Sequence, residues 1–493
     1  LSTTIANAYI QPQMASYLAQ FQARFSDEGL NCPILMMTAG GGMTTMETAA
    51  RLPIRLVESG PAGGAILAAR IAAETGERKV LSFDMGGTTA KLCLIDDSRP
   101  QTARKFEIAR AARFIKGSGM PVRIPVIEMI EIGAGGGSIA HVDRLGRLQV
   151  GPESAGSEPG PAAFAKGGTD PTVTDADVMQ GLIEPDLFAE GRLTIDIDAA
   201  EKALERRVGQ ALGLDAAPAA RGVSEIVDEN LAAAGRMHAV ESGKELSARL
   251  MIAFGGNGPL HATRVARRAQ VARILIPRDP GVGSAVGFLF APVSFEIIRS
   301  RYATLETLDL EGINAFFDDM IDEAEAVVRA GAPKGPLVRR RMAFMRYHGQ
   351  GHEIEIPLPD RPLDDFDIPE SRKRFENAYS QQFSRAVPGM TIEILNWALE
   401  ISSEPRALEH YPTPAERQPA QPSGQRSILC EVSDKWRMAD IHNRAALGPG
   451  DHLEGPALII EPQTTTFVSA DFTARVDGGG NIWPVSYTHL TLP

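Results

Sequence analysis

The chain contains 493 residues, of which 43% are hydrophobic and 23% are charged; this is the composition of a folded globular protein and excludes a disordered or fibrous chain. The length is enough for about three domains, each with its own core. The 62 acidic and 50 basic residues give a net charge of -12, which excludes a nucleic-acid-binding surface because phosphate backbones require clustered lysine and arginine.

Residues 1–78 are predicted to alternate helices with short strands. The pattern at 14–28 is typical of an amphipathic helix, and the apolar residues at 33–37 indicate a short strand. A Ser-Gly-Pro-Ala-Gly-Gly turn then precedes an alanine-rich helix. We interpret Gly63 and Gly64 of that turn as positions of tight helix packing, although a glycine turn before a helix also suits an anion.

The most informative segment is VLSFDMGGTTAKLCLID, residues 80–96, in which two apolar strands flank a glycine turn. Glycines let backbone N–H groups approach an anion closely, and threonines add hydroxyl donors. Asp84, at the end of the first strand, is placed to hold a hydrated Mg²⁺ and is the main catalytic candidate. The same pattern also fits an ordinary hairpin turn. The residues expected to contact phosphates are Gly86, Gly87, Thr88 and Thr89.

Lys91 lies on the strand that leaves this turn. It either points at a phosphate, as a further nucleotide contact, or points away and is solvated. The sequence leaves these two alternatives open.

A second run of glycines, residues 133–138, follows the apolar run IPVIEMIEIG. Consecutive glycines allow backbone N–H groups to converge on an anion or substrate, and the alternative is a flexible turn. The next stretch, 151–168, is rich in Gly, Pro, Ser and Ala and is predicted to be a long irregular loop, which is often functional. The residues expected in the anion or substrate loop are Gly135, Gly136, Gly137 and Ser138.

Helical patterns dominate residues 199–240, and an apolar strand at 250–254 then runs into another glycine turn and a helix. A helix N-terminus offers free N–H groups and the positive end of its dipole, and glycines let a ribose or phosphate lie against the backbone. This order predicts the nucleoside side of a nucleotide site. Its expected residues are Gly255, Gly256, Asn257 and Gly258.

Other polar residues give weaker signals. Asp175 is a second, weaker catalytic candidate for general acid/base work, but the Thr-Asp pattern around it favours a helix cap. His261 is expected to pack or cap rather than react. His348 and His352 are separated by glycines and lack a third ligand, so we predict no metal cluster there.

The character of the chain changes after residue 293. Alternation at 345–359 predicts a β-hairpin, and 428–485 is β-rich. We therefore expect a separate C-terminal α+β domain at 299–484.

No apolar run approaches the roughly 20 residues that cross a bilayer, so we expect no membrane segment. Cys32, Cys93 and Cys430 are widely spaced and odd in number, which favours reduced thiols and a cytoplasmic protein.

The two nucleotide-type turns, in this order, resemble the second phosphate loop and the adenosine loop of the actin-like ATPase superfamily. Five ordered motifs resemble one branch of it, the hydantoinase A, 5-oxoprolinase and acetone carboxylase family: SGPAGGAILAA, FDMGGTTAKLCLI, IGAGGGSIA, GPESAGSEPGPAAFAKGGTDPTVTDADV and FGGNGPLHA. The resemblance implies an α/β fold in which an actin-like, ribonuclease H-like ATPase domain at 1–298 precedes a smaller, β-rich α+β domain.

The same resemblance implies ATP and Mg²⁺ as cofactors, with Asp84 holding the metal through water. Actin-like ATPases carry a first phosphate loop in an N-terminal lobe, and we expect that lobe to be missing here through a truncated gene model. Residues 485–493 depart from the family pattern and are expected to be a non-native tail. Many members also read Ser-Thr-Asp where this chain has Thr89-Ala90-Lys91.

The function implied is that of a subunit of an ATP-dependent hydrolase that opens a cyclic amide or imide through phosphorylation of the carbonyl oxygen. Hydantoin, N-methylhydantoin and 5-oxoproline are the expected substrate types, and a hydantoinase B-type subunit is the expected partner in a hetero-oligomer. The Thr-Thr-Ala-Lys sequence also suits the alternative, a β-type subunit of an acetone or acetophenone carboxylase that acts on a ketone. A non-catalytic nucleotide switch is the third hypothesis.

Overall fold

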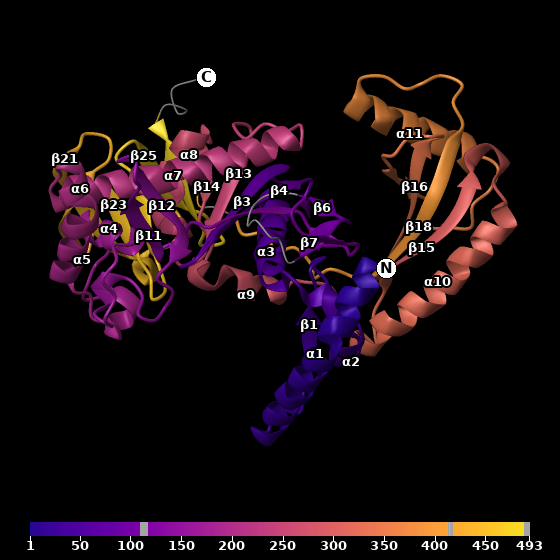
Figure 1. The fold of residues 1–493 in the computed structure, drawn as a ribbon, viewed down its shortest axis with the longest axis horizontal. Helices are drawn as coiled ribbons and strands as arrows, with labels where there is room; N and C mark the ends of the chain where they lie inside the picture. Colours follow the sequence, from indigo (N-terminus) through magenta and orange to yellow (C-terminus); the bar gives the residue numbers. More distant parts are fainter. Residues whose placement is uncertain (109–116, 413, 415–417, 488–493) are drawn as a thin grey trace.

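The computed structural model describes residues 1–108, 117–412, 414 and 418–487, and Figure 1 shows a larger α/β body and a smaller body built on a separate sheet. A ten-stranded mixed sheet crosses the larger body. Its strands, in spatial order, are β10 (Met129–Ile132), β4 (Ala90–Asp96), β3 (Lys79–Met85), β13 (Leu250–Phe254), β14 (Arg273–Leu275), β26 (Ile482–Ser486), β25 (Phe472–Val476), β22 (Asp451–Glu454) and β19 (Gln418–Pro419), with β5 (Arg99–Pro100) beside β4.

The centre of this sheet is buried on both faces, which explains why its strands are continuous apolar runs. Strands β3 and β4 form the predicted antiparallel hairpin, and β3 runs parallel to β13. Helix α3 packs on one face of the central strands, and α7 and α8 pack on the other. The helices around the sheet are α3 (Ser59–Thr75), α7 (Ala216–Glu241), α8 (Gly258–Ala269) and the short α9 (Gly283–Phe288).

Gly63 and Gly64 lie inside α3 rather than in a turn before it. A Cβ on Gly63 would lie 2.3 Å from the Ser284 carbonyl oxygen, and one on Gly64 would lie 2.5 Å from the Phe254 ring. Both glycines therefore allow close packing of α3 on its neighbours, as the sequence indicated.

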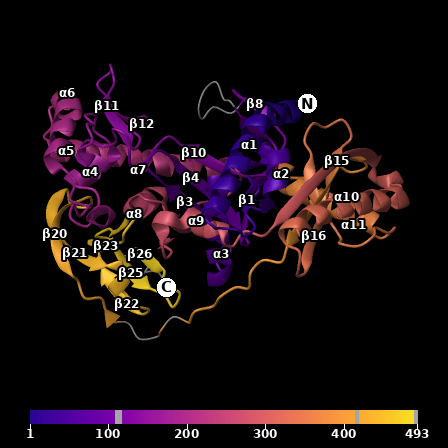
Figure 2. The ribbon, with the colours of Figure 1, turned by 90° about the horizontal axis from the view of Figure 1, so that it is seen from below.

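Beyond one end of the central sheet, a hairpin, a group of helices and a second sheet pack together. Figure 2 shows the strands β20–β26 grouped at the α4–α6 end of the larger body. The core there joins α4, α5 and α8 to the second sheet. The elements are β11 (Ser138–Val142), β12 (Leu148–Ser154), α4 (Val173–Met179), α5 (Ile197–Leu204), α6 (Gln210–Leu212), β20 (Gly424–Cys430), β21 (Lys435–Asn443), β23 (Ala457–Ile460) and β24 (Thr465–Val468).

The smaller body is a four-stranded antiparallel sheet with two helices on one face (Figure 1). The predicted hairpin is confirmed as β16 and β17. Aromatic side chains fill its core, with the rings of Phe317 and Trp397 edge to face at 5.9 Å. Its elements are β15 (Ser294–Thr304), β18 (Ile392–Ser403), β16 (Leu337–Tyr347), β17 (Ile354–Leu358), α10 (Leu310–Gly331) and α11 (Asp367–Phe383).

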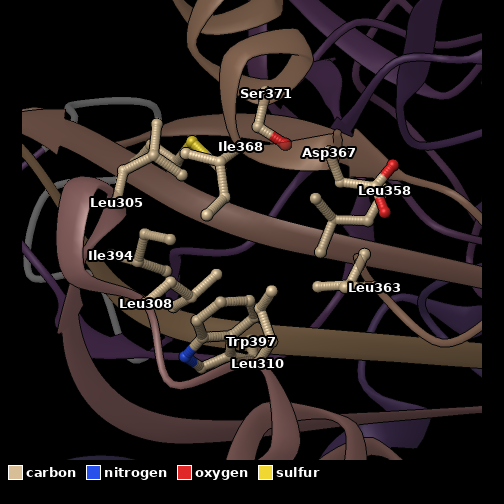
Figure 3. A pocket seen from close by; sticks show the side chains of 11 residues that line it. Leu305, Leu308, Leu310, Leu358, Leu363, Asp367, Ile368, Ser371, Ile394 and Trp397 are labelled. Carbon is tan, nitrogen blue, oxygen red and sulfur yellow. The ribbon is translucent and has the colours of Figure 1, made fainter. Parts of the chain in front are cut away.

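Figure 3 shows a gap inside this core, lined mainly by leucine and isoleucine side chains around Trp397. Its volume is about 10 Å³. That is the space of a single water molecule at most, so the gap is a packing feature rather than a ligand site.

The chain after the smaller body differs from the sequence prediction, which assigned 299–484 to one domain. Residues 294–403 form the smaller body, whereas β19–β26 return to the larger one. There β26 pairs with β14, and Phe472 and Ile482 enter the main core. The β-rich composition of 428–485 indicates strands but not the sheets that they join, so the sequence did not show that these strands return to the larger body.

The two chain ends also differ from expectation. Helix α1 (Ser2–Asp27) begins twelve residues earlier than predicted, and only Ala6 and Leu18 of it are buried. At the other end, Val485 and Ser486 of the predicted tail belong to β26, while 488–493 lie outside the described residues.

Short elements complete the N-terminal region and the connection to the central sheet. The strand predicted at 33–37 is confirmed as β1. These elements are β1 (Leu35–Met37), β2 (Met43–Thr45), α2 (Met46–Arg51), β6 (Thr102–Ala103), β7 (Phe106–Ile108), β8 (Met120–Val122) and β9 (Val126–Ile127). Among the described residues, no helix combines the length and apolar character that a bilayer span requires.

Candidate functional site

The carboxylate of Asp84 lies at the carboxyl end of β3, beside the end of β13. The two strands are parallel with Asp84 opposite Phe254, so the glycine turns that follow them emerge at the same edge of the sheet. A Cβ on Gly255 would lie 2.5 Å from Asp84 Oδ1, and Gly255 has a φ of +90°. Only glycine fits both requirements, so the two turns are in contact at Asp84.

Ser284, at the start of α9, is a partner of Asp84 that the sequence analysis missed. Its hydroxyl donates a hydrogen bond to Asp84 Oδ2 over 2.9 Å. Burial raises the pKa of Asp84, while this hydrogen bond and the charge of Lys91 act in the opposite direction. Nothing in the local sequence of Ser284 signals the contact, because the two residues are 200 positions apart.

The turn after β3 leaves two backbone donors free. The Gly86 N–H closes the turn by donating to the Thr89 carbonyl oxygen over 3.1 Å. Gly87 and Thr88 are exposed, and their N–H groups donate to no acceptor in the described part of the chain. These two N–H groups are available to an anion.

Two other glycine loops hold the turn in place. The Asn257 side chain donates to the Gly86 carbonyl oxygen over 3.1 Å, and the Gly136 N–H donates to the same oxygen over 3.1 Å. The Gly137 N–H donates to the Gly87 carbonyl oxygen over 2.6 Å. The loops predicted separately from the sequence therefore meet in one hydrogen-bonded site.

The loop at 133–138 differs in role from the open anion nest that we expected. The N–H groups of Gly136 and Gly137 are used by the turn, and the Gly135 N–H donates to the Ser138 hydroxyl over 2.9 Å. A Cβ on Gly135 would lie 2.7 Å from the Gly86 carbonyl oxygen. Consecutive glycines here permit close approach of two backbones, so this loop supports the 86–89 turn.

The loop after β13 is fixed by contacts on three sides. The Gly255 N–H donates to the Pro280 carbonyl oxygen over 2.8 Å, and the Asn257 N–H donates to the Met85 carbonyl oxygen over 2.9 Å. Thr464, between β23 and β24, donates its hydroxyl to the Gly256 carbonyl oxygen over 2.8 Å. Helix α8 begins at Gly258, so its N-terminus faces the same region.

Lys91 points back toward the turn. Its Nζ donates to the Thr89 hydroxyl over 2.8 Å and lies 3.6 Å from a carboxylate oxygen of Glu131. Its side chain is only 19% exposed. Of the two alternatives left by the sequence, the structure supports a lysine at the turn rather than a solvated one.

Asp175 is a buried structural residue. Its Oδ1 accepts from the Ala163 N–H over 2.7 Å, and its Oδ2 accepts from the Thr172 N–H over 2.7 Å. With Thr172 it forms a capping box at the start of α4. Burial raises the pKa of Asp175, against these hydrogen bonds. The capping alternative accounts for its position, and we assign it no acid/base role.

Behind the 255–258 loop lies a buried set of charged side chains that the sequence analysis missed. His261 Nδ1 lies 2.7 Å from Asp228 Oδ1, and His261 Nε2 lies 3.2 Å from Asp177 Oδ2. Arg264 lies 2.8 Å from Asp228 and 3.3 Å from Asp177. We call these four residues the His261 cluster; they tie α8 to α4 and α7.

The His261 cluster combines two basic and two acidic side chains. Burial is the largest influence and lowers the pKa of His261, but the carboxylates of Asp177 and Asp228 outweigh it, so that the pKa is raised overall. His261, whose raised pKa favours its protonated form, and Arg264 then face two carboxylates. The histidine and arginine are one helical turn apart in HATR, but their partners are 33 to 87 residues away in the sequence, so no local pattern reveals the cluster.

A hollow of about 670 Å³ lies elsewhere, between the N-terminal region, the β5–β6 segment and the sheet of the smaller body. Arg104 crosses it and pairs with Glu296 and with Glu355. Asp96, on its wall, lies opposite Lys79 in the register of β4 and β3. Because Lys79 is five residues from Asp84 along β3, this wall is about 17 Å from the turn, and the hollow is separate from the site at Asp84.

Comparison with known families places both parts of the chain in one group. The family model described as hydantoinase/oxoprolinase matches residues 1–297, and that of the hydantoinase/oxoprolinase C-terminal domain matches residues 310–479. An uncharacterised protein of Methanocaldococcus jannaschii is 34% identical over 97% of this chain and 69% of its own length. The chain therefore spans about two thirds of the length of such a relative.

Two solved structures share the fold. The ATP-dependent caprolactamase from Pseudomonas jessenii has a TM-score of 0.82 and 26% identity, covering 99% of this chain and 70% of that chain. In sequence, the caprolactamase subunit alpha of that organism is 27% identical over 97% of this chain and 68% of its own length. A nucleotide-free acetone carboxylase, with a TM-score of 0.77 and 22% identity over 95% of this chain and 66% of that one, shows the fold alone. The matches confirm the family resemblance and the α/β fold class predicted from the motifs.

Proposed function

Because the chain belongs to the hydantoinase/oxoprolinase family, we propose that it is the ATP-using subunit of an enzyme that opens cyclic amide rings. The observation that carries this proposal is the joining of Asp84, the 86–89 turn and the 255–258 loop into one hydrogen-bonded site. The caprolactamase relative supports it, because a caprolactam is a cyclic amide and that enzyme is ATP-dependent.

The phosphates of ATP would lie on the 86–89 turn. The free N–H groups of Gly87 and Thr88 and the exposed Thr88 side chain supply donors there, and Lys91 adds a positive charge beside Thr89. The ribose would lie over Gly255 and Gly256, where there is no side chain to exclude it. The N-terminus of α8 favours the negative charge of the phosphates.

Asp84 would hold Mg²⁺ through water. Mg²⁺ bound with nucleotide phosphates keeps several waters and commonly uses one or two carboxylates, so one half-buried carboxylate at the turn fits it. The described residues contain no group of three ligand-type side chains, which agrees with a site completed by water and phosphate. Bound there, the ion supplies charge neutralisation at the γ-phosphate.

The chemistry follows from the stability of the substrate amide, which resists hydrolysis until it is activated. Its carbonyl oxygen attacks the γ-phosphorus, the bond to the β,γ-bridging oxygen breaks, and ADP leaves, so that the oxygen becomes part of a leaving group. Water then adds to the activated carbon, the ring C–N bond breaks, and hydrolysis releases phosphate, with two waters consumed overall. This chain's groups would hold the phosphate in line and keep bulk water away from it.

We also propose a cytoplasmic hetero-oligomer containing a hydantoinase B-type partner. The name of the caprolactamase relative, a subunit alpha, supports a multi-subunit enzyme, and all three cysteines of this chain are unpaired thiols. The second candidate function is a β-type carboxylase subunit acting on a ketone. The sequence Thr89-Ala90-Lys91, which resembles that of the ketone-acting branch, favours it.

The test is phosphate release from ATP by the chain coexpressed with its genomic neighbours, measured with lactams, hydantoins, 5-oxoproline, and acetone with bicarbonate. We expect stimulation by a cyclic amide and a loss on the order of 100-fold in Asp84→Asn, because that carboxylate would lie at the phosphate end of the site. The control is Asp97→Asn at the far, exposed end of the same hairpin, where we expect no change.

Stimulation only by the ketone with bicarbonate would instead establish the second candidate. ATP hydrolysis that no compound stimulates would favour a nucleotide switch and overturn the enzyme proposal.

A further inference from the structure

We propose that Gln463, between β23 and β24, reads the base of the bound nucleotide and makes the site prefer adenine to guanine. This inference rests on the proposed function, since it concerns the nucleoside end of the same site. It brings into the site the segment after β23, which the sequence analysis left in a separate C-terminal domain.

Three loops from distant parts of the sequence meet at this end of the site. The 255–258 loop is hydrogen-bonded to Pro280 through the Gly255 N–H, over 2.8 Å. It is bonded to the β23–β24 loop through the Thr464 hydroxyl and the Gly256 carbonyl oxygen, also over 2.8 Å. The second and third loops touch each other, because a Cβ on Gly281 would lie 2.5 Å from Gln463 Cβ.

The order of contacts places Gln463 beyond the phosphates. Asp84, at the phosphate end, lies against Gly255, and the next residue, Gly256, borders the Gln463 backbone: a Cβ there would lie 4.0 Å from the Gln463 carbonyl oxygen. A nucleotide with its phosphates at the turn would therefore pass over two glycines and reach Gln463 at its base. Glycine at 256 keeps this path free of a side chain, and glycine at 281 leaves room for Gln463.

The side chain of Gln463 is available for a ligand. It is exposed, and its amide makes no hydrogen bond with any residue that the structure describes. The loop that carries it is nevertheless anchored: Thr464 is buried, and the Glu461 N–H donates to the Thr464 carbonyl oxygen over 3.0 Å. A free amide on a fixed loop can recognise a planar base without a large ordering cost.

The amide chemistry favours adenine. A glutamine offers one acceptor and two donors, which match the N6 amino group and the N7 acceptor of adenine in a bidentate pair. Guanine presents two acceptors, O6 and N7, at the same edge, and the side chains that match those are arginine and lysine. Replacing the glutamine should therefore change the preference in a direction set by the new side chain.

The experiment compares ATP and GTP binding to the 493-residue chain by titration calorimetry, with circular dichroism to confirm folding. We expect Gln463→Ala to lower the ratio of ATP to GTP association constants about tenfold, which is the typical weight of one bidentate base contact. Gln463→Arg should make GTP the tighter ligand. Gln210→Ala, an exposed glutamine on α6, is the matched control and should leave the ratio unchanged.

The outcomes separate this inference from the proposed function. An unchanged ratio in both Gln463 variants, with ATP still bound and Asp84→Asn still blocking phosphate release, would overturn the role of Gln463 alone. A wild-type chain that binds neither nucleotide would overturn both.

Discussion

The site formed by the 86–89 turn and the 255–258 loop meets the His261 cluster at the start of α8. The two use their polar groups in opposite ways. At the turn, the Gly87 and Thr88 N–H groups are exposed and have no acceptor within the described residues. In the cluster, two basic side chains face two carboxylates, and all four side chains are almost wholly buried. Free donors on a fixed backbone suit a ligand, whereas balanced buried charges suit a rigid support.

Removing a charge from the cluster should have the largest effect. We expect Asp228→Asn to lower the free energy of unfolding by about 3–5 kcal/mol, because His261 and Arg264 are left buried with one carboxylate between them. Chemical denaturation measures this. Glu229→Gln, the next residue on α7 but exposed, is the control and should change stability by less than about 0.5 kcal/mol. Equal changes in the unfolding free energy of the two variants would mean that the His261 cluster does not stabilise the fold.

Adding a side chain to the 133–138 loop, which supports the 86–89 turn, should have the next largest effect. A Cβ on Gly135 would overlap the backbone of the 86–89 turn, so Gly135→Ala should cost about 1–3 kcal/mol of stability and weaken ATP binding. Gly60→Ala, in the exposed first turn of α3 with no atom within 4 Å, is the matched control and should be neutral or slightly stabilising. If Gly135→Ala binds ATP normally, the interlocking of the two loops does not shape the site.

The smallest expected effect is a pH dependence. The pKa of His261 is raised in the folded chain, so the folded state keeps a proton that the unfolded chain loses near pH 6.5. This contribution is complete below that pH and is lost as the pH rises through the folded pKa, with a slope of at most about 1.4 kcal/mol per pH unit.

The measurement is the unfolding free energy of the wild type and of His261→Gln from pH 6 to pH 9. We expect the wild type to lose stability relative to the variant across this range. Parallel pH profiles would show that His261 does not carry the extra proton.

The comparison also shows which features a sequence reveals. Gly86, Gly87 and Asn257 belong to short motifs whose chemistry depends on neighbouring residues, and the structure joins them as one site. Ser284 and Thr464 reach the same site through single contacts across some 200 residues, and neither lies in a recognisable pattern. The partners in the His261 cluster are hidden for the same reason.

The fold shows the same limit. The β-rich composition of the last segment predicted strands correctly, but the pairing of β26 with β14 depends on the whole sheet. Runs of glycine carry a second ambiguity, because they permit either an anion nest or close packing of two backbones. Gly136 and Gly137 proved to be the second kind, since their N–H groups bond the neighbouring turn.

The central claim is that the 86–89 turn and the 255–258 loop hold the nucleotide. Amide hydrogen exchange of the chain with and without a non-hydrolysable ATP analogue and Mg²⁺ tests it most directly. The account predicts new protection at both segments and at the β23–β24 loop, with β16 and β17 unchanged. Protection confined to the walls of the hollow around Arg104, with none at the 86–89 turn, would contradict it.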